Sequence, residues 1–105
     1  MARDGAEKYL MENAVSPDHK VRVDKARFMA MKEAVLAVLP PEAPGITPAE
    51  LREAIRPILS QEHFPGGEKA GWWMKGVQLD LEFKGIIARG SAKPVKLYKV
   101  QAATF

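Results

Sequence analysis

The stretch PGITPAE at residues 44–50 carries the clearest local signature of structure in the chain. Thr47 suits the N-cap of a helix, and the proline after it loses no hydrogen bond at the first helical position. Glu50 at the third position can reach back to the Thr47 amide, which completes a capping box. A helix is therefore predicted from Thr47 to a kink near Arg56, where a proline follows. Ile46, just before the cap, is predicted to form a strand of one or two residues.

A second helix is predicted upstream, over residues 24–39. Asp24 suits its N-cap, because a carboxylate there accepts hydrogen bonds from the free amides of the first turn. Apolar side chains recur at spacings of three and four residues, which is typical of a helix with one buried face. Two prolines at 40–41 end the pattern. This apolar stripe is interpreted as core: Phe28, Met31, Val35 and Val38.

Downstream, a third helix is predicted over residues 71–84, after a connection whose turn is at 64–67. Trp73, Val77 and Leu81 share one face of this helix and are predicted to be buried. Gly85 suits the residue after its last turn. A glycine at position 76, inside the helix, indicates close approach of another element, expected to be a helix. Phe64 is expected to anchor the connection on the core.

The chain is predicted to finish as a β-hairpin with strands at 86–89 and 95–100. Residues 1–23 are expected to form a loosely packed arm with a turn or two of helix over residues 7–13. Residues 101–105 are expected to be a tail. The predicted class is α+β, with one domain over 24–100 built from a three-helix core and this hairpin.

The net charge of +3 is unevenly distributed along the 105 residues. Residues 61–105 carry seven basic and four acidic side chains, which accounts for the whole excess. Such clustering indicates a surface that attracts phosphate, although a solvated lysine-rich face gives the same pattern. No apolar run reaches the length of a membrane span, and the first ten residues lack the apolar core of a secretory signal. With no cysteine, the chain fits a reducing compartment, and a cytoplasmic location is expected.

The order of helix, strand stub, helix, loop, helix and hairpin over residues 24–100 resembles a winged helix-turn-helix domain. Three segments are also similar to a small family of uncharacterised bacterial proteins: PGITPAE at 44–50, FPGGEKAGWW at 64–73 and VQLDLEFKG at 77–85. The winged-helix resemblance implies binding of duplex DNA. It implies that the third helix enters the major groove and that the hairpin, or wing, follows the backbone.

On this resemblance, six side chains are candidates for contact with DNA: Lys69, Lys75, Gln78, Arg89, Lys93 and Lys96. Lys75 and Gln78 are the candidates for base contact, because lysine donates to guanine and glutamine pairs with adenine. The three basic residues of the hairpin are candidates for phosphate contact. Asp80 and Glu82 oppose DNA binding if they are exposed, and leave it open if a lysine neutralises them.

Trp72 supports a different function. Adjacent residues on a helix point about 100° apart, so Trp72 and Trp73 cannot both be buried in one stripe. A half-exposed indole marks an interface, unless it covers the loop at Phe64. One alternative is therefore a protein–protein interaction module, or a homodimer, that uses Trp72 and the third helix. Another is a structural domain that binds no nucleic acid.

The sequence gives little support for catalysis. His19 and His63 are the only histidines, and they lack the spacing of a metal-binding helix motif. No nucleophile elbow or phosphate-binding loop is present. We therefore expect no enzyme activity, no metal site and no cofactor.

Overall fold

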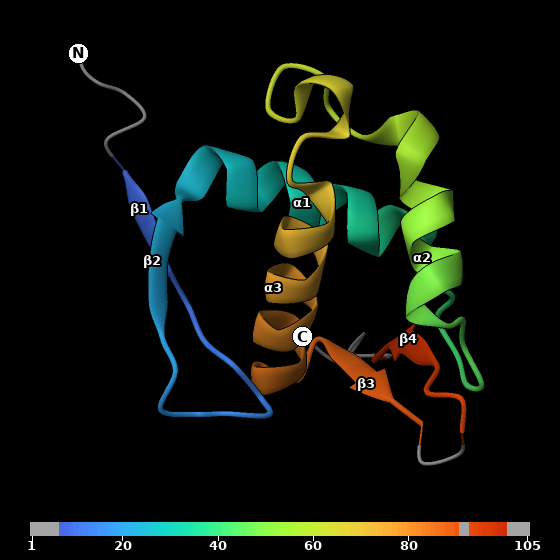
Figure 1. The fold of residues 1–105 in the computed structure, drawn as a ribbon. Coiled ribbons are helices and arrows are strands. Elements are labelled where there is room, and N and C mark those ends of the chain that lie inside the picture. Colours follow the sequence, from blue (N-terminus) through green and yellow to red (C-terminus); the bar gives the residue numbers. More distant parts are fainter. Residues whose placement is uncertain (1–6, 91–92, 101–105) are drawn as a thin grey trace.

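The computed structural model describes residues 7–90 and 93–100 and has three α-helices and two antiparallel hairpins (Figure 1). The elements are β1 (Lys8–Met11), β2 (Val21–Asp24), α1 (Lys25–Val38), α2 (Pro48–Ile55), the 3₁₀ turns η2 (Arg56–Ile58) and η3 (Pro65–Gly67), α3 (Ala70–Phe83), β3 (Ile87–Arg89) and β4 (Leu97–Lys99). The predicted α+β class is confirmed. The expected tail, 101–105, and the first six residues of the expected arm lie outside the described residues.

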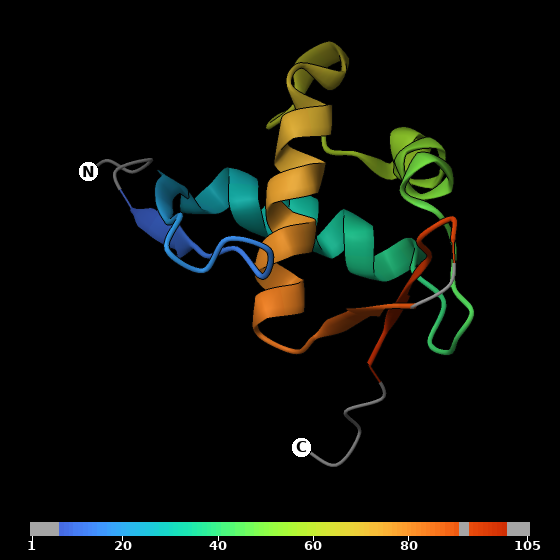
Figure 2. The same cartoon turned by 60° about the horizontal axis from the view of Figure 1, so that its bottom comes forward.

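The helices α1 and α3 cross each other at the centre of the molecule. The β1–β2 hairpin lies on one side of α3, and α2 lies on the other side, above β3 and β4 (Figures 1 and 2). The completely buried side chains come mainly from the three helices and the last strand, and include Phe28, Met31, Leu51, Ile55, Val77, Leu81 and Leu97. The apolar stripes predicted from helical periodicity therefore meet in one core.

Two of the three predicted helix starts are confirmed by side-chain caps. One oxygen of the Asp24 carboxylate accepts hydrogen bonds from the amides of Ala26 and Arg27, at 2.9 and 3.3 Å. The Thr47 hydroxyl accepts from the Glu50 amide at 3.1 Å, and the Glu50 carboxylate accepts from the Thr47 amide at 2.9 Å. These side chains satisfy amides that the first helical turn leaves without partners.

The predicted strand stub at Ile46 pairs with the last strand. Its amide donates to the Leu97 carbonyl at 2.9 Å, and the Leu97 amide donates back to the Ile46 carbonyl at 2.7 Å. Leu97 also lies opposite Arg89 in the β3–β4 pairing. Close approach here requires glycine before the stub, because a Cβ on Gly45, whose φ is +85°, would lie 2.0 Å from the Leu97 oxygen. The hairpin is thereby fixed to the start of α2.

The prediction of a loose, partly helical arm is wrong. Residues 8–11 form a strand in which alternate side chains face the core, and Tyr9 lies opposite Val23 in the pairing with β2. The Tyr9 ring stacks on Phe28 with a centroid distance of 3.9 Å. Met11 is buried and fills the space above Gly76, in place of the expected helix. The packed unit therefore begins before the expected boundary at residue 24.

Candidate nucleic-acid interface

The exposed candidate residues lie at the two ends of α3. Lys69, Trp72 and Lys75 are exposed at its N-terminal end. Lys93 is exposed and Lys96 is half-buried in the β3–β4 hairpin, which follows the opposite end of the helix (Figure 1). From its rise per residue, α3 is about 21 Å long. The structure thus gives two basic groups, one at each end of this helix.

Gln78 does not lie on an exposed face, which corrects its prediction as a base-reading residue. It is 1% exposed, and its side-chain amide donates a 2.8 Å hydrogen bond to Glu82. The periodicity of α3 indicates a narrow buried stripe, but α1, β1 and β3 all pack against the helix and bury a wider arc. In this conformation the amide cannot reach a base edge.

Arg89, a candidate for phosphate contact, is exposed at the end of β3 and is paired with Glu82. Its guanidinium donates two hydrogen bonds to the Glu82 carboxylate, at 2.9 and 3.1 Å. These bonds raise the pKa of Arg89 above its ordinary value. The opposite charges of Arg89 and Glu82 therefore offset each other. Their contact is bidentate, which is a strong form of the hydrogen bond between a guanidinium and a carboxylate.

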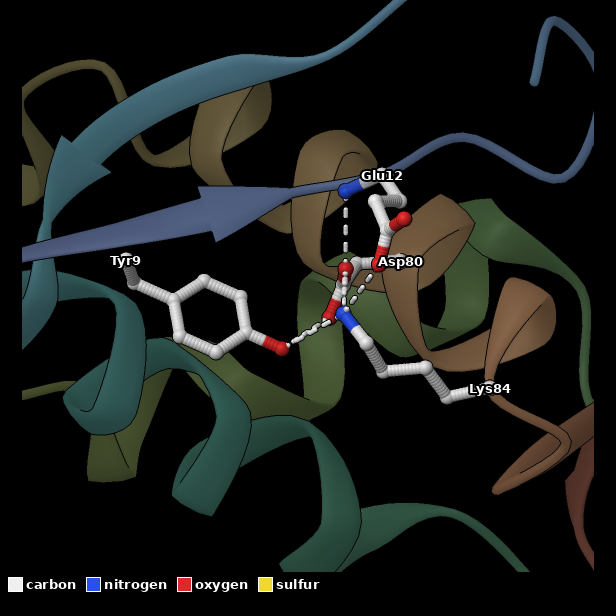
Figure 3. A network of polar contacts seen from close by, with 4 residues as sticks. All are labelled: Tyr9, Glu12, Asp80 and Lys84. Carbon is white, nitrogen blue, oxygen red and sulfur yellow. Dashed lines mark hydrogen bonds and ion pairs between the residues drawn. The ribbon is translucent and has the colours of Figure 1, made fainter. Parts of the chain in front are cut away.

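Asp80 is completely buried and is neutralised by Lys84, which is the outcome that leaves DNA binding open. Its carboxylate also accepts hydrogen bonds of 2.8 Å from the Tyr9 hydroxyl and from the Glu12 amide (Figure 3). The Lys84 ammonium contacts Glu12 at 3.3 Å and donates to the Tyr9 oxygen at 2.7 Å. Burial lowers the pKa of Lys84, but the bonds to Asp80 and Tyr9 outweigh it and raise the net value. This network joins the N-terminal hairpin to α3.

Four of the predicted cations form no ion pair with any of the residues that the structure describes. Within residues 7–90 and 93–100, no ion pair involves Lys69, Lys75, Lys93 or Lys96. Lys93 and Lys96 line an open groove together with Pro44 and Tyr98. The basic groups at the two ends of α3 are therefore not offset by Asp80 or Glu82, which have cationic partners of their own.

A cluster of aromatic side chains surrounds the N-terminal end of α3. Trp72 is 53% exposed and Trp73 is buried, with ring centroids 5.3 Å apart. Phe64 is completely buried against Trp73, which confirms it as the anchor of the connection. Arg27 of α1 also contacts this cluster, and sequence reasoning missed it. No local pattern signals a contact between residues that lie so far apart in the sequence.

The described residues contain no group of three side chains suited to hold a metal ion, and none of their helices is long and apolar enough to span a membrane. The fold and site define a small α+β domain with basic side chains at the two ends of α3. The chain belongs to a family of unknown function, DUF6958, whose model matches residues 8–97. No curated protein and no solved structure matches the chain.

Proposed function

We propose that the chain is a winged-helix protein that binds duplex DNA mainly through phosphates. In this proposal the N-terminal half of α3 faces the major groove and the β3–β4 hairpin, the wing, follows the backbone. The order of the helices and wing supports it, as does the pairing of Ile46 with Leu97, which fixes the wing to the helices.

The observation that carries the proposal is the balance of charge on this surface. Asp80 and Glu82 have cationic partners from inside the fold, whereas Lys69, Lys75, Lys93 and Lys96 form no ion pair within the described part of the chain. Unpaired lysines release counterions from DNA when they contact phosphates, which provides affinity without sequence preference. Because Gln78 is buried, Lys75 is the one remaining base-contact candidate, and we expect weak sequence preference.

The test is a titration of a labelled mixed-sequence duplex, followed by fluorescence anisotropy at several salt concentrations. The double variant Lys93→Glu/Lys96→Glu is expected to bind more weakly, and its salt slope is expected to fall by roughly 2 for two lost phosphate contacts. The control is Lys8→Glu/Lys20→Glu, which makes the same change of charge at two exposed positions of the N-terminal hairpin.

Three results would count against this proposal. Absence of binding at low salt removes DNA as a partner. Equal weakening by the wing and control variants means that net charge alone attracts the duplex. Unchanged binding by the wing variant means that the wing does not contact the backbone.

The exposure of Trp72 favours a second candidate function, recognition of a protein through α3. An indole that is 53% exposed presents a large rigid apolar surface, which is common at interfaces. Association of this kind is expected to be insensitive to salt and to be lost in Trp72→Ala without loss of fold. Analytical ultracentrifugation at low and high salt distinguishes it from DNA binding.

A further inference from the structure

A pocket lies where the N-terminal end of α3 meets α1. It is lined by Arg27, Lys69, Trp72 and Trp73 and has a volume of about 450 Å³. We propose that this pocket binds a small organic oxyanion, namely a carboxylate or phosphate group carried on a flat apolar ring. The inference does not depend on DNA binding.

The guanidinium of Arg27 packs against aromatic rings and has no acidic partner among the described residues. Its guanidinium carbon lies 5.0 Å from the centre of the Phe64 ring and 5.1 Å from that of Trp73. Its Nε is buried and has no hydrogen-bond partner, and no carboxylate in the described residues pairs with it. Rings attract a cation but accept no hydrogen bond in the plane of the guanidinium, so the group still lacks an oxygen acceptor.

The terminal nitrogens of Arg27 remain open to such an acceptor. Of the three guanidinium nitrogens, Nε alone is both buried and unpartnered, and the residue lines the pocket. A guanidinium matches the geometry of a carboxylate or phosphate with two parallel hydrogen bonds. An oxyanion in the pocket would therefore satisfy a cation that the fold has partly desolvated but not paired.

Lys69 adds a second cation at the same place. It is exposed, forms no ion pair in the described part of the chain, and lines the pocket. It is also the N-cap of α3, where its φ of +57° is left-handed and no side chain caps the helix. The uncapped amides of the first turn make this end of the helix positive. Glu68, the adjacent acid in sequence, does not line the pocket.

Trp72 indicates that the oxyanion is attached to a ring. A bare inorganic ion would satisfy the cations but would leave the indole half-exposed. The Trp72 and Trp73 rings meet edge to face, at an interplanar angle of 82°, so at least one face of the Trp72 ring is not used by Trp73. A flat apolar ring can stack there, and the volume lies within the range of small-ligand pockets.

Intrinsic fluorescence gives a direct test, because the two tryptophans of the chain both line this pocket. The probes are benzoate, phenyl phosphate and the neutral analogue benzamide. We expect saturable quenching by at least one of the two anions, at a concentration at least tenfold lower than for benzamide. The comparison of the anions shows whether the pocket prefers a carboxylate or a phosphate. Equal binding of benzamide, or no saturable quenching by either anion, overturns the proposal.

Two variants locate the binding. Lys69→Asn removes one charge and keeps a residue that tolerates positive φ, and Arg27→Met removes the other charge while keeping an apolar stem. Each is expected to weaken anion binding roughly tenfold, as for loss of a charge-assisted hydrogen bond. The control Lys75→Gln, which makes the same change of charge on the same helix, is expected to bind as the unmodified chain does.

Thermal unfolding shows whether each variant is folded. If Arg27→Met does not fold, the effect of Lys69→Asn on anion binding is the test. Anion binding that is unchanged in Lys69→Asn, or weakened equally in Lys75→Gln, places the ligand elsewhere and contradicts the proposal.

Discussion

The Tyr9 hydroxyl donates a 2.8 Å hydrogen bond to the carboxylate of Asp80, which lies 71 residues later in the chain. Asp80 is completely buried, so this contact and the ion pair with Lys84 replace the water that the carboxylate loses. The contact holds β1 against α3. The N-terminal hairpin therefore covers part of α3 and helps to determine which of its side chains are exposed to solvent.

Replacement of Asp80 is expected to destabilise the fold strongly. In Asp80→Ala, the Glu12 amide and the Tyr9 hydroxyl lose their acceptor, and Lys84 loses its buried partner, at a cost of about 3 kcal/mol. Urea denaturation measures the change. The control is Asp18→Ala, at an exposed position in a turn. Its effect on stability is expected to be small, about 0.5 kcal/mol at most. A similar small effect for Asp80→Ala would mean that the network contributes nothing to stability.

Stability is expected to fall at alkaline pH. Burial and the Asp80 carboxylate raise the pKa of Tyr9 against the opposing effect of Lys84, whose own pKa is also raised. A raised pKa means that the folded chain holds the proton more tightly than the unfolded chain. This stabilisation is present below the unfolded pKa values and is lost as pH rises through the folded ones.

Denaturation curves between about pH 9 and pH 11 measure this loss. Tyr9→Phe removes one of the two titrating groups, so its stability should fall less over the same interval. An equal fall in both proteins would show that Tyr9 takes no part in the pH dependence.

Gly45 is expected to tolerate no side chain. Gly45→Ala places a Cβ 2.0 Å from the Leu97 carbonyl oxygen, which must break the pairing of Ile46 with Leu97. Gly85→Ala is the matched control, because Gly85 also has a positive φ, of +76°, but nothing lies within 4 Å of its Cβ position. The control is expected to cost about 1–2 kcal/mol for the left-handed backbone alone. Gly45→Ala should cost clearly more in thermal unfolding, and equal costs would contradict the predicted clash.

Release of Arg89 from its ion pair with Glu82 is expected to strengthen DNA binding if the β3–β4 hairpin follows the DNA backbone, as proposed. Glu82→Gln removes a negative charge and frees the guanidinium beside the wing, which adds one possible phosphate contact. The salt slope of duplex binding should become steeper by about 0.9. Glu33→Gln makes the same change of charge at an exposed position of α1 and should leave the slope unaltered. Identical slopes for the two variants would place Arg89 away from the backbone.

Local signals explain why much of the helical fold could be predicted from sequence. Asp24 and Thr47 cap helices with their own side chains, so each helix start depends on residues within one turn. The stripe of Trp73, Val77 and Leu81 depends only on spacing along one helix. The strand stub at Ile46 is marked by its position between a glycine and a cap.

The hairpin β1–β2 could not be predicted in this way. Its strands are four residues long, and neither carries an apolar alternation long enough to distinguish it from a short helix. What fixes β1 is the contact of Tyr9 with Phe28 and Asp80, which only the folded chain brings together.

In the candidate site, too, some features could be predicted from the sequence and others depend on tertiary contacts. The exposure of lysines such as Lys75 and Lys93 can be predicted from their residue type, because long charged side chains are rarely buried. The burial of Gln78 and the pairing of Arg89 with Glu82 depend on which elements cover α3, and the contact of Arg27 with Trp73 joins separate helices. Contacts between separate elements cannot be predicted from the periodicity of a single element.

The long separation between Tyr9 and Asp80 also has a consequence for the order in which the newly made chain can fold. Synthesis produces β1 first and its partner on α3 much later. Because a ribosome adds only a handful of amino acids each second, several seconds separate the two events. During that interval Tyr9 and Met11 have no α3 surface to pack against. The N-terminal strand can pack only after α3 has been made, and the core is complete only when Leu97 of the last strand has also been added.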